Sequence, residues 1–157
     1  MSYPITLTSL AAREAISDAL YRAITGFDHN DVSIFNSAFA GEDAVMELRE
    51  EETKIIRGLS AIRTEVLGPV GPMDTTHMIS NMRIEVKDGA NTASLTAYAL
   101  EQHCPPGKGK DPNGPKYLVG AEYFIDMVRD EEDGLWKIKK WVLEVVWHQG
   151  DPSVLAL

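Results

Sequence analysis

The first thirty residues carry apolar side chains at a helical spacing. Five of them recur every three or four positions and would form one stripe along a helix: Ile16, Leu20, Ala23, Ile24 and Phe27. Thr8 or Ser9 can cap the start of this helix, and Gly26 with the polar run 28–31 ends it.

A second helix, a hairpin and a third helix follow. Asp31 has the side chain of an N-cap for a short helix with apolar residues at 34, 35 and 39. Residues 44–48 and 54–56 are typical of two strands around an acidic turn. Residues 58–66 return to helical spacing, and the stretch 68–72, rich in glycine and proline, predicts the end of that helix.

The pattern changes from helical to extended after residue 76. Four long segments predict strands: 77–86, 92–103, 117–129 and 136–147. Turn signals at 87–89 and 133–134 predict hairpins. The loop 105–115 is too rich in proline and glycine to be regular. A loop of this length is often functional or mobile, and it leaves directly from His103.

Helices followed by hairpin-linked antiparallel strands indicate an α+β fold. About three N-terminal helices would cover one face of a strongly curved antiparallel sheet. A sheet curled around helices encloses a conical cavity, which suits one small molecule. The length of 157 residues fits one domain, residues 1–157, and shows no internal repeat.

The chain is acidic, with a net charge of −9 and a pI near 4.8. Nucleic acids and anionic membranes attract basic faces, so we expect neither partner. This charge does not argue against a small neutral ligand. The single cysteine, Cys104, permits no intrachain disulfide and fits a filler thiol in a reducing compartment. Without a signal-peptide pattern or an apolar run of about 18 residues, we expect a cytoplasmic protein.

Two histidines and one aspartate are the candidate chemical groups. His77 starts one predicted strand and His103 ends the next, while Asp28 lies just past the end of the first helix. Imidazole titrates near neutral pH, so a pocket that holds two imidazoles beside a carboxylate can move protons. The three residues are far apart in sequence, so only a particular fold would bring them together.

Six segments, in their order and spacing, carry a resemblance to a known family: 26–31, 39–44, 76–81, 120–126, 133–138 and 147–151. On these segments the chain resembles the SnoaL-like members of the NTF2-like superfamily, and among them the scytalone dehydratases. The resemblance spans nearly the whole chain and implies the NTF2-like conical fold. It also implies that His77 is the catalytic strand histidine, that His103 is the second pocket histidine, and that Asp28 orients a histidine.

The resemblance further implies positions that contact the substrate. Tyr123 and Ile125 fall where family members face the cavity. Phe27 and Glu47 stand at or near the positions of two tyrosines that hold a water against the substrate carbonyl in scytalone dehydratase. Six residues are our candidate substrate contacts: Phe27, Glu47, Asn81, Tyr123, Ile125 and Tyr21. Glu47 would face outward in the other strand register, and Asn81 shares a face with His77 unless a bulge intervenes.

We therefore predict a cofactor-free lyase, chiefly a dehydratase, that acts on a polyketide-like or terpenoid-like small molecule. His77 would be the acid and base, Asp28 would orient it, and His103 would stabilise the developing oxyanion or the leaving group. An isomerase or cyclase would use the same enol-type intermediate, and a non-catalytic binding or structural subunit would use the same fold. Two histidines and a carboxylate also match a non-haem iron triad, but the resemblance implies catalysis without a metal. The open edges of a curved sheet favour a homodimer or homotrimer.

Overall fold

The computed structural model describes residues 2–155. Its helical elements lie mainly in the first half of the chain: α1 (Ala12–His29), α2 (Val32–Ser37), α3 (Leu59–Ile62), a π-helical segment (Arg63–Leu67), α4 (Gly68–Val70) and the short 3-10 helices Gly41–Asp43 and Pro152–Leu155. Its strands are β1 (Val45–Arg49), β2 (Thr53–Arg57), β3 (Asp74–Glu85), β4 (Thr92–Cys104), β5 (Tyr117–Arg129) and β6 (Trp136–Gly150). The expected α+β order of elements is confirmed.

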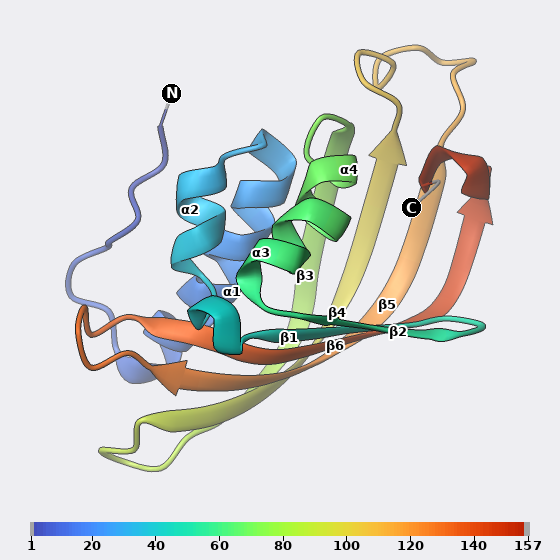
Figure 1. The fold of residues 1–157 in the computed structure, drawn as a ribbon. Helices are drawn as coiled ribbons and strands as arrows, with labels where there is room; N and C mark the ends of the chain where they lie inside the picture. The colour runs from blue at the N-terminus through green and yellow to red at the C-terminus, as the bar shows by residue number, and fades with distance from the viewer. Residues whose placement is uncertain (1, 156–157) are drawn as a thin grey trace.

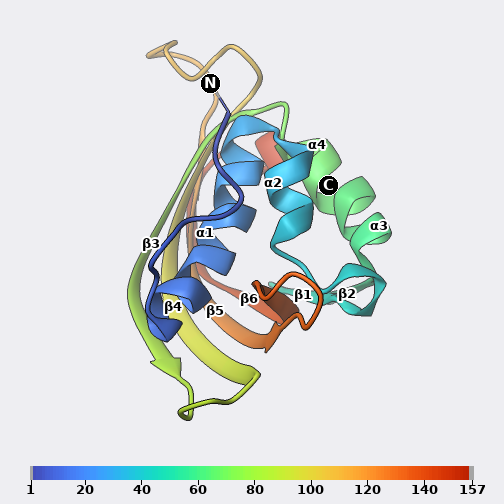
Figure 2. The ribbon, with the colours of Figure 1, turned by 90° about the vertical axis from the view of Figure 1, so that its left-hand side faces the viewer.

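The six strands form one strongly bent sheet in the order β2-β1-β6-β5-β4-β3. The helices lie on its concave side, with α1 crossing β3 to β6 and α3 and α4 standing opposite (Figures 1 and 2). Neighbouring strands are antiparallel except for β1 and β6, which are parallel. The sheet is therefore mixed, because β1 of the β1–β2 hairpin pairs with β6, the last strand, rather than with its neighbour in sequence, β3.

The first helix buries the predicted stripe. All five residues of the stripe lie in the core with α2 against them. Gly26 permits this contact, because a β-carbon there would lie 2.6 Å from Cβ of Phe35. The expected caps are wrong: the N-cap is Ala11, whose backbone N–H donates to the Glu14 carboxylate at 2.7 Å. Asp31 does cap α2, as predicted, by accepting backbone N–H groups of Ser33 and Ile34.

The third helical region runs past its expected end. The π-helical segment and α4 carry it to Val70, although 68–72 predicted a stop. Pro69 follows the π-helical segment, and the backbone of Leu67 and Gly68 stays in the right-handed helical region, so the helical path continues through the proline. This extension places Val66 and Val70 on the inner side, facing the sheet.

The convex face of the sheet carries exposed apolar side chains. One row of cross-strand partners runs over β3, β4, β5 and β6: Met78, Leu100, Gly120 and Trp147. Trp147 lies over Gly120, where a side chain would collide with its indole ring. Tyr98 and Phe124 extend the exposed apolar surface. Across residues 2–155, no helix has the length and apolar character that a membrane crossing requires.

Candidate active site

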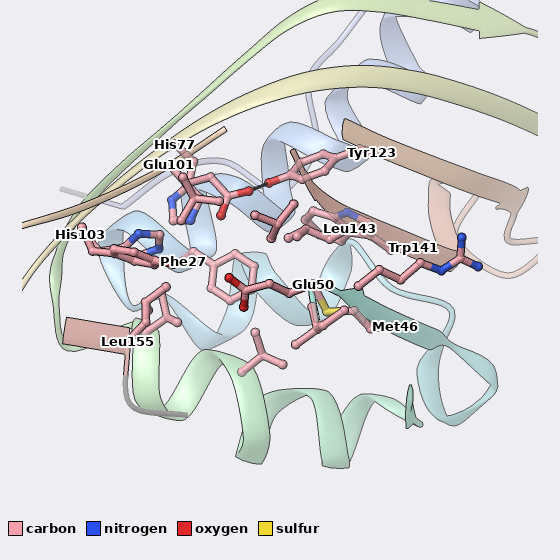
Figure 3. A pocket seen from close by; sticks show the side chains of 17 residues that line it. Phe27, Met46, Glu50, His77, Glu101, His103, Tyr123, Trp141, Leu143 and Leu155 are labelled. Carbon is pink, nitrogen blue, oxygen red and sulfur yellow. Dashed lines mark hydrogen bonds between the residues drawn. The ribbon is translucent and has the colours of Figure 1, made fainter. Parts of the chain in front are cut away.

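A cavity of about 130 Å³ lies between the concave face of the sheet and the helices (Figure 3). That volume is comparable to the ~150 Å³ cavities that accept one benzene ring. Ten apolar residues line it: Phe27, Met46, Leu48, Val66, Val70, Val119, Trp141, Leu143, Val145 and Leu155. The polar lining residues are Arg49, Glu50, His77, Glu101, His103, Tyr117 and Tyr123. The buried polar groups are therefore few and gathered on one wall.

Asp28 and His77 form the pair that the sequence predicted. Asp28 stands in the last turn of α1, and its Oδ1 lies 2.6 Å from Nδ1 of His77 on β3. The other carboxylate oxygen accepts the backbone N–H of His77 at 3.1 Å, and Oδ1 also accepts the Thr75 hydroxyl at 2.8 Å. The His77 side chain is 6% exposed. The carboxylate thus fixes the orientation of the ring and leaves Nε2 for a ligand.

In the Asp28–His77 pair, each charged group stabilises the charged form of the other. Burial disfavours both charged forms, but the hydrogen bond and the opposite charge across the pair outweigh it. The pKa of Asp28 is lowered below its usual value. The pKa of His77 is raised above its usual value, and the negative charge of Glu101 adds to this effect. At neutral pH the pair therefore favours an aspartate facing an imidazolium.

His103 on β4 is the second imidazole of the cavity. It is 2% exposed, and its ring stands perpendicular to that of His77 with 5.3 Å between the ring centroids. Its Nδ1 is buried and finds no hydrogen-bond partner within residues 2–155. Burial, and then the positive charge of His77, lower the pKa of His103 to about 4. This imidazole is therefore neutral at physiological pH and offers an unpaired nitrogen to a bound molecule.

Glu101 belongs to the same cluster, although it was not among the residues predicted from the sequence. It is the cross-strand partner of His77, lies two residues before His103 on the same face of β4, and is 5% exposed. Its carboxylate accepts the phenol hydroxyl of Tyr123 (Figure 3). Burial raises the pKa of Glu101 against the opposing effects of the His77 charge and the Tyr123 hydrogen bond. The spacing Glu-x-His on one strand was the available signal.

Two predicted substrate contacts do line the cavity. Tyr123 is fully buried, and burial together with the Glu101 charge raises its pKa well above the usual value, so the phenol stays protonated. Phe27 packs against His77 with 5.7 Å between ring centroids and an interplanar angle of 26°. Having no hydroxyl, Phe27 contributes shape and apolar surface, and it cannot hold a water.

Four of the predicted contacts lie outside the cavity. Glu47 points away from it, because Met46 and Leu48 take the inner face of β1; Glu47 pairs instead with Lys140 and Arg49, each at 2.7 Å. Tyr21 lies on the outer side of α1 and is 47% exposed. Ile125 is buried in the core two residues beyond Tyr123, and it does not reach the cavity.

Asn81 does not line the cavity, because a β-bulge intervenes. The register of β3 and β4 shifts between Ser80 and Arg83, and Asn81 adopts a left-handed backbone with φ of 52°. Before the bulge His77 and Ile79 face inward, and after it Met82 does, so Asn81 is turned to solvent. The bulge therefore shifts the alternation of inward-facing and outward-facing side chains by one residue.

The cluster also has the composition of a metal-ligand set. One ligand atom each from His77, Glu101 and His103 lie within 4.8 Å of one another. Two imidazole nitrogens and a carboxylate oxygen could hold a divalent transition metal, with Asp28 supporting His77 from behind. The same three groups without a metal form a proton-transfer cluster.

Comparison with known proteins identifies the family. The model of the SnoaL-like domain matches residues 8–142, so the chain belongs to the SnoaL-like family, as the sequence motifs suggested. It is 40% identical over 154 residues to Terrestric acid biosynthesis cluster protein E of Penicillium crustosum, an alignment that covers 98% of this chain and 96% of that protein.

Solved structures with the same NTF2-like fold come from several bacterial proteins. A protein of Novosphingobium aromaticivorans provisionally named an aromatic ring hydroxylase has a TM-score of 0.73 and 23% identity, covering 91% of this chain and 95% of its own. A second protein of that species, provisionally named a scytalone dehydratase, has a TM-score of 0.72 and 20% identity, with 88% and 87% covered. The hexachlorocyclohexane dehydrochlorinase LinA-type3 of Novosphingobium barchaimii LL02 has a TM-score of 0.68 and 20% identity, with 89% and 90% covered.

Proposed function

We propose that the protein is an acid–base enzyme of secondary metabolism, chiefly a dehydratase, acting on a polyketide-like or terpenoid-like small molecule. The observation that carries this proposal is the Asp28–His77 hydrogen bond on the polar wall of a buried apolar cavity. A buried histidine with a shifted pKa in a cleft is the arrangement expected of a general acid or base.

The reaction would run through an enol-type intermediate. Loss of a proton beside a carbonyl gives an enolate, and protonation of the adjacent hydroxyl releases water. Asp28 orients His77, which exchanges protons with the substrate, and neutral His103 hydrogen-bonds the developing oxyanion or the leaving oxygen. The apolar walls exclude water and strengthen these electrostatic contacts. No step of this sequence needs a cofactor.

The names of related proteins support the class of reaction. The relative from Penicillium crustosum is named for a biosynthesis cluster, which fits a role in the synthesis of a secondary metabolite. Two of the solved structures are named for eliminations, of water and of hydrogen chloride. Both reactions remove a proton and a leaving group from neighbouring carbons, so one acid–base site can serve either.

Mass spectrometry would test this proposal. The purified protein is incubated with one-ring β-hydroxy ketones, beginning with 3-hydroxycyclohexanone, and each product is compared with that of the H77N variant. We expect a loss of 18 Da that requires His77. A new compound of unchanged mass would favour an isomerase or cyclase, whereas unchanged compounds that still bind would favour a non-catalytic binding protein.

A further inference from the structure

His77 lies between two carboxyl groups. The need to orient the His77 ring accounts for only one of them, that of Asp28. Asp28 occupies Nδ1 from the helix side. Glu101 faces His77 across the β3–β4 pair, with its ligand atom within 4.8 Å of those of both histidines. Because Asp28 already fixes the ring, positioning His77 does not require Glu101.

Burying a second acidic group here is costly, so it calls for a reason. An apolar side chain would fill the position of Glu101, as Leu95, Ala97 and Ala99 do further along the inward face of β4. Removing a carboxylate from water is unfavourable unless the carboxylate is paired. Glu101 accepts a hydrogen bond from Tyr123, lines the cavity, and has a ligand atom within 4.8 Å of those of the two histidines.

Dehydration needs two proton carriers in opposite states. One group must accept the proton of a C–H bond, and another must donate a proton to the departing hydroxyl. Asp28 occupies Nδ1, so His77 offers the cavity a single nitrogen, Nε2, and this nitrogen serves the departing hydroxyl. The C–H proton then needs a separate acceptor, and the carboxyl group of Glu101 lies beside both imidazoles on the same wall.

We propose that Glu101 is a catalytic residue, the base that removes the substrate's C–H proton, and that Tyr123 positions it. The Glu101 carboxylate takes the proton, and the C–H electron pair moves to form the enolate. The enolate then re-forms its carbonyl while the neighbouring C–O bond breaks, and the departing hydroxide takes the Nε2 proton of His77 and leaves as water. Transfer of the proton from Glu101 to His77 across the cluster restores the starting state.

This inference rests on the proposed acid–base function, and one probe separates the two. In D₂O, 3-hydroxycyclohexanone reports C–H cleavage as deuterium uptake at C2 by NMR, and reports dehydration as the enone by absorbance. Its single ring suits the cavity of about 130 Å³. Four proteins are compared: wild type, E101Q, H77Q and the control E122Q, whose carboxylate is on the outer face of β5 opposite Tyr98.

We expect E101Q to lower both deuterium uptake and enone formation by about 10²–10⁴-fold, the usual contribution of a general base. H77Q should lower enone formation by a similar factor while deuterium uptake stays within about ten-fold of wild type, and E122Q should match wild type. If E101Q retains deuterium uptake and H77Q loses it, His77 is the base and our assignment of Glu101 is overturned. If wild type accelerates neither readout, the acid–base function itself fails.

The Y123F variant and a shortened base guard against a merely structural effect. The Tyr123 hydrogen bond lowers the pKa of Glu101, so its removal should raise that pKa and move the acidic limb of the pH–rate profile to higher pH. E101D keeps a carboxylate and should recover part of the deuterium uptake that E101Q loses. An unchanged profile in Y123F together with an inactive but folded E101D would contradict the proposal.

Discussion

The carboxylate of Asp28 binds both the ring and the backbone of His77, at 2.6 Å from Nδ1 and 3.1 Å from the amide nitrogen. One side chain at the end of α1 therefore fixes the proton-carrying ring and also docks the helix on β3. The shared contact means that orientation of the imidazole and packing of the helix cannot vary independently.

The D28N variant should lose most of its activity. Without the aspartate charge, burial dominates, so the pKa of His77 should fall below its present raised value; histidine NMR titration measures this. We expect turnover to fall by about 10²–10⁴-fold and the free energy of unfolding by about 1–3 kcal/mol. T75V removes only one hydrogen bond to Asp28 and is the matched control. A D28N protein with an unchanged His77 pKa would refute this electrostatic account.

His103 should make the fold sensitive to acid. Its pKa is about 4 in the folded protein against 6.5 as the reference value, so the unfolded chain binds more protons between these values. Stability from this group is present above pH 6.5 and is lost as the pH falls toward 4. The difference amounts to roughly 3 kcal/mol.

Denaturant unfolding at several pH values would measure this effect. The H103Q variant should lose stability less steeply than wild type between pH 6.5 and 4, whereas H148Q, at an exposed histidine, should follow wild type. Parallel curves for wild type and H103Q would show that His103 titrates normally.

A divalent metal should inhibit the proposed enzyme. Zn²⁺ can take nitrogen and oxygen ligands from His77, Glu101 and His103 and would block all three. We expect Zn²⁺ to inhibit dehydration of 3-hydroxycyclohexanone, H103Q to be less sensitive, and EDTA to leave wild-type activity unchanged. Activity that disappears with EDTA and returns with a metal would instead support a metal-dependent reaction.

The convex face should mediate self-association. Met78, Leu100 and Trp147 form an exposed apolar row over Gly120, and such a surface is unusual on a monomer. We propose a homodimer or homotrimer through this face. L100R should shift the mass measured by light scattering to that of a monomer, and L7R, at an exposed leucine outside the sheet, should not. Equal masses for wild type and L100R would exclude this interface.

Arg22 should be a major contributor to stability. Its buried guanidinium pairs with Asp18 at 2.9 Å and donates to the carbonyl oxygen of Trp136 at 2.6 Å. R22L would leave these acceptors unpaired, and we expect a loss of about 3–5 kcal/mol in the free energy of unfolding. R57L makes the same change at an exposed position and should cost much less. Similar losses in the two variants would contradict the importance of burial.

Hydrophobic patterns that repeat along a whole helix or strand made most of the fold predictable. Helical spacing identified α1, and alternation with turn signals identified β3 to β6, because the core selects the face of each element. The parallel pairing of β1 with β6 was not predictable in the same way. A strand of five residues carries no information on which edge of a distant strand it joins.

The parts of the site that depend on unusual residue chemistry were predictable. The parts that depend on strand register, which decides whether a side chain faces the cavity, were not. His77, His103 and Asp28 came together as predicted. Glu47 was misplaced because an acidic residue between two apolar ones fits either face of β1. Glu101 was missed because acidic residues in strands usually face water; only its spacing from His103 argued otherwise.

The bulge at Asn81 gives β3 two halves whose inward-facing positions are out of step. A deletion of one residue there would point the inward-facing side chains of one half of β3 to solvent. The affected half would be either the one that carries His77 or the one that packs on α1. When relatives of this chain are aligned, a histidine matching His77 therefore carries weight only if the spacing from it to the second half of the strand is also kept. Length variation within the 105–115 loop carries no such constraint on strand phase.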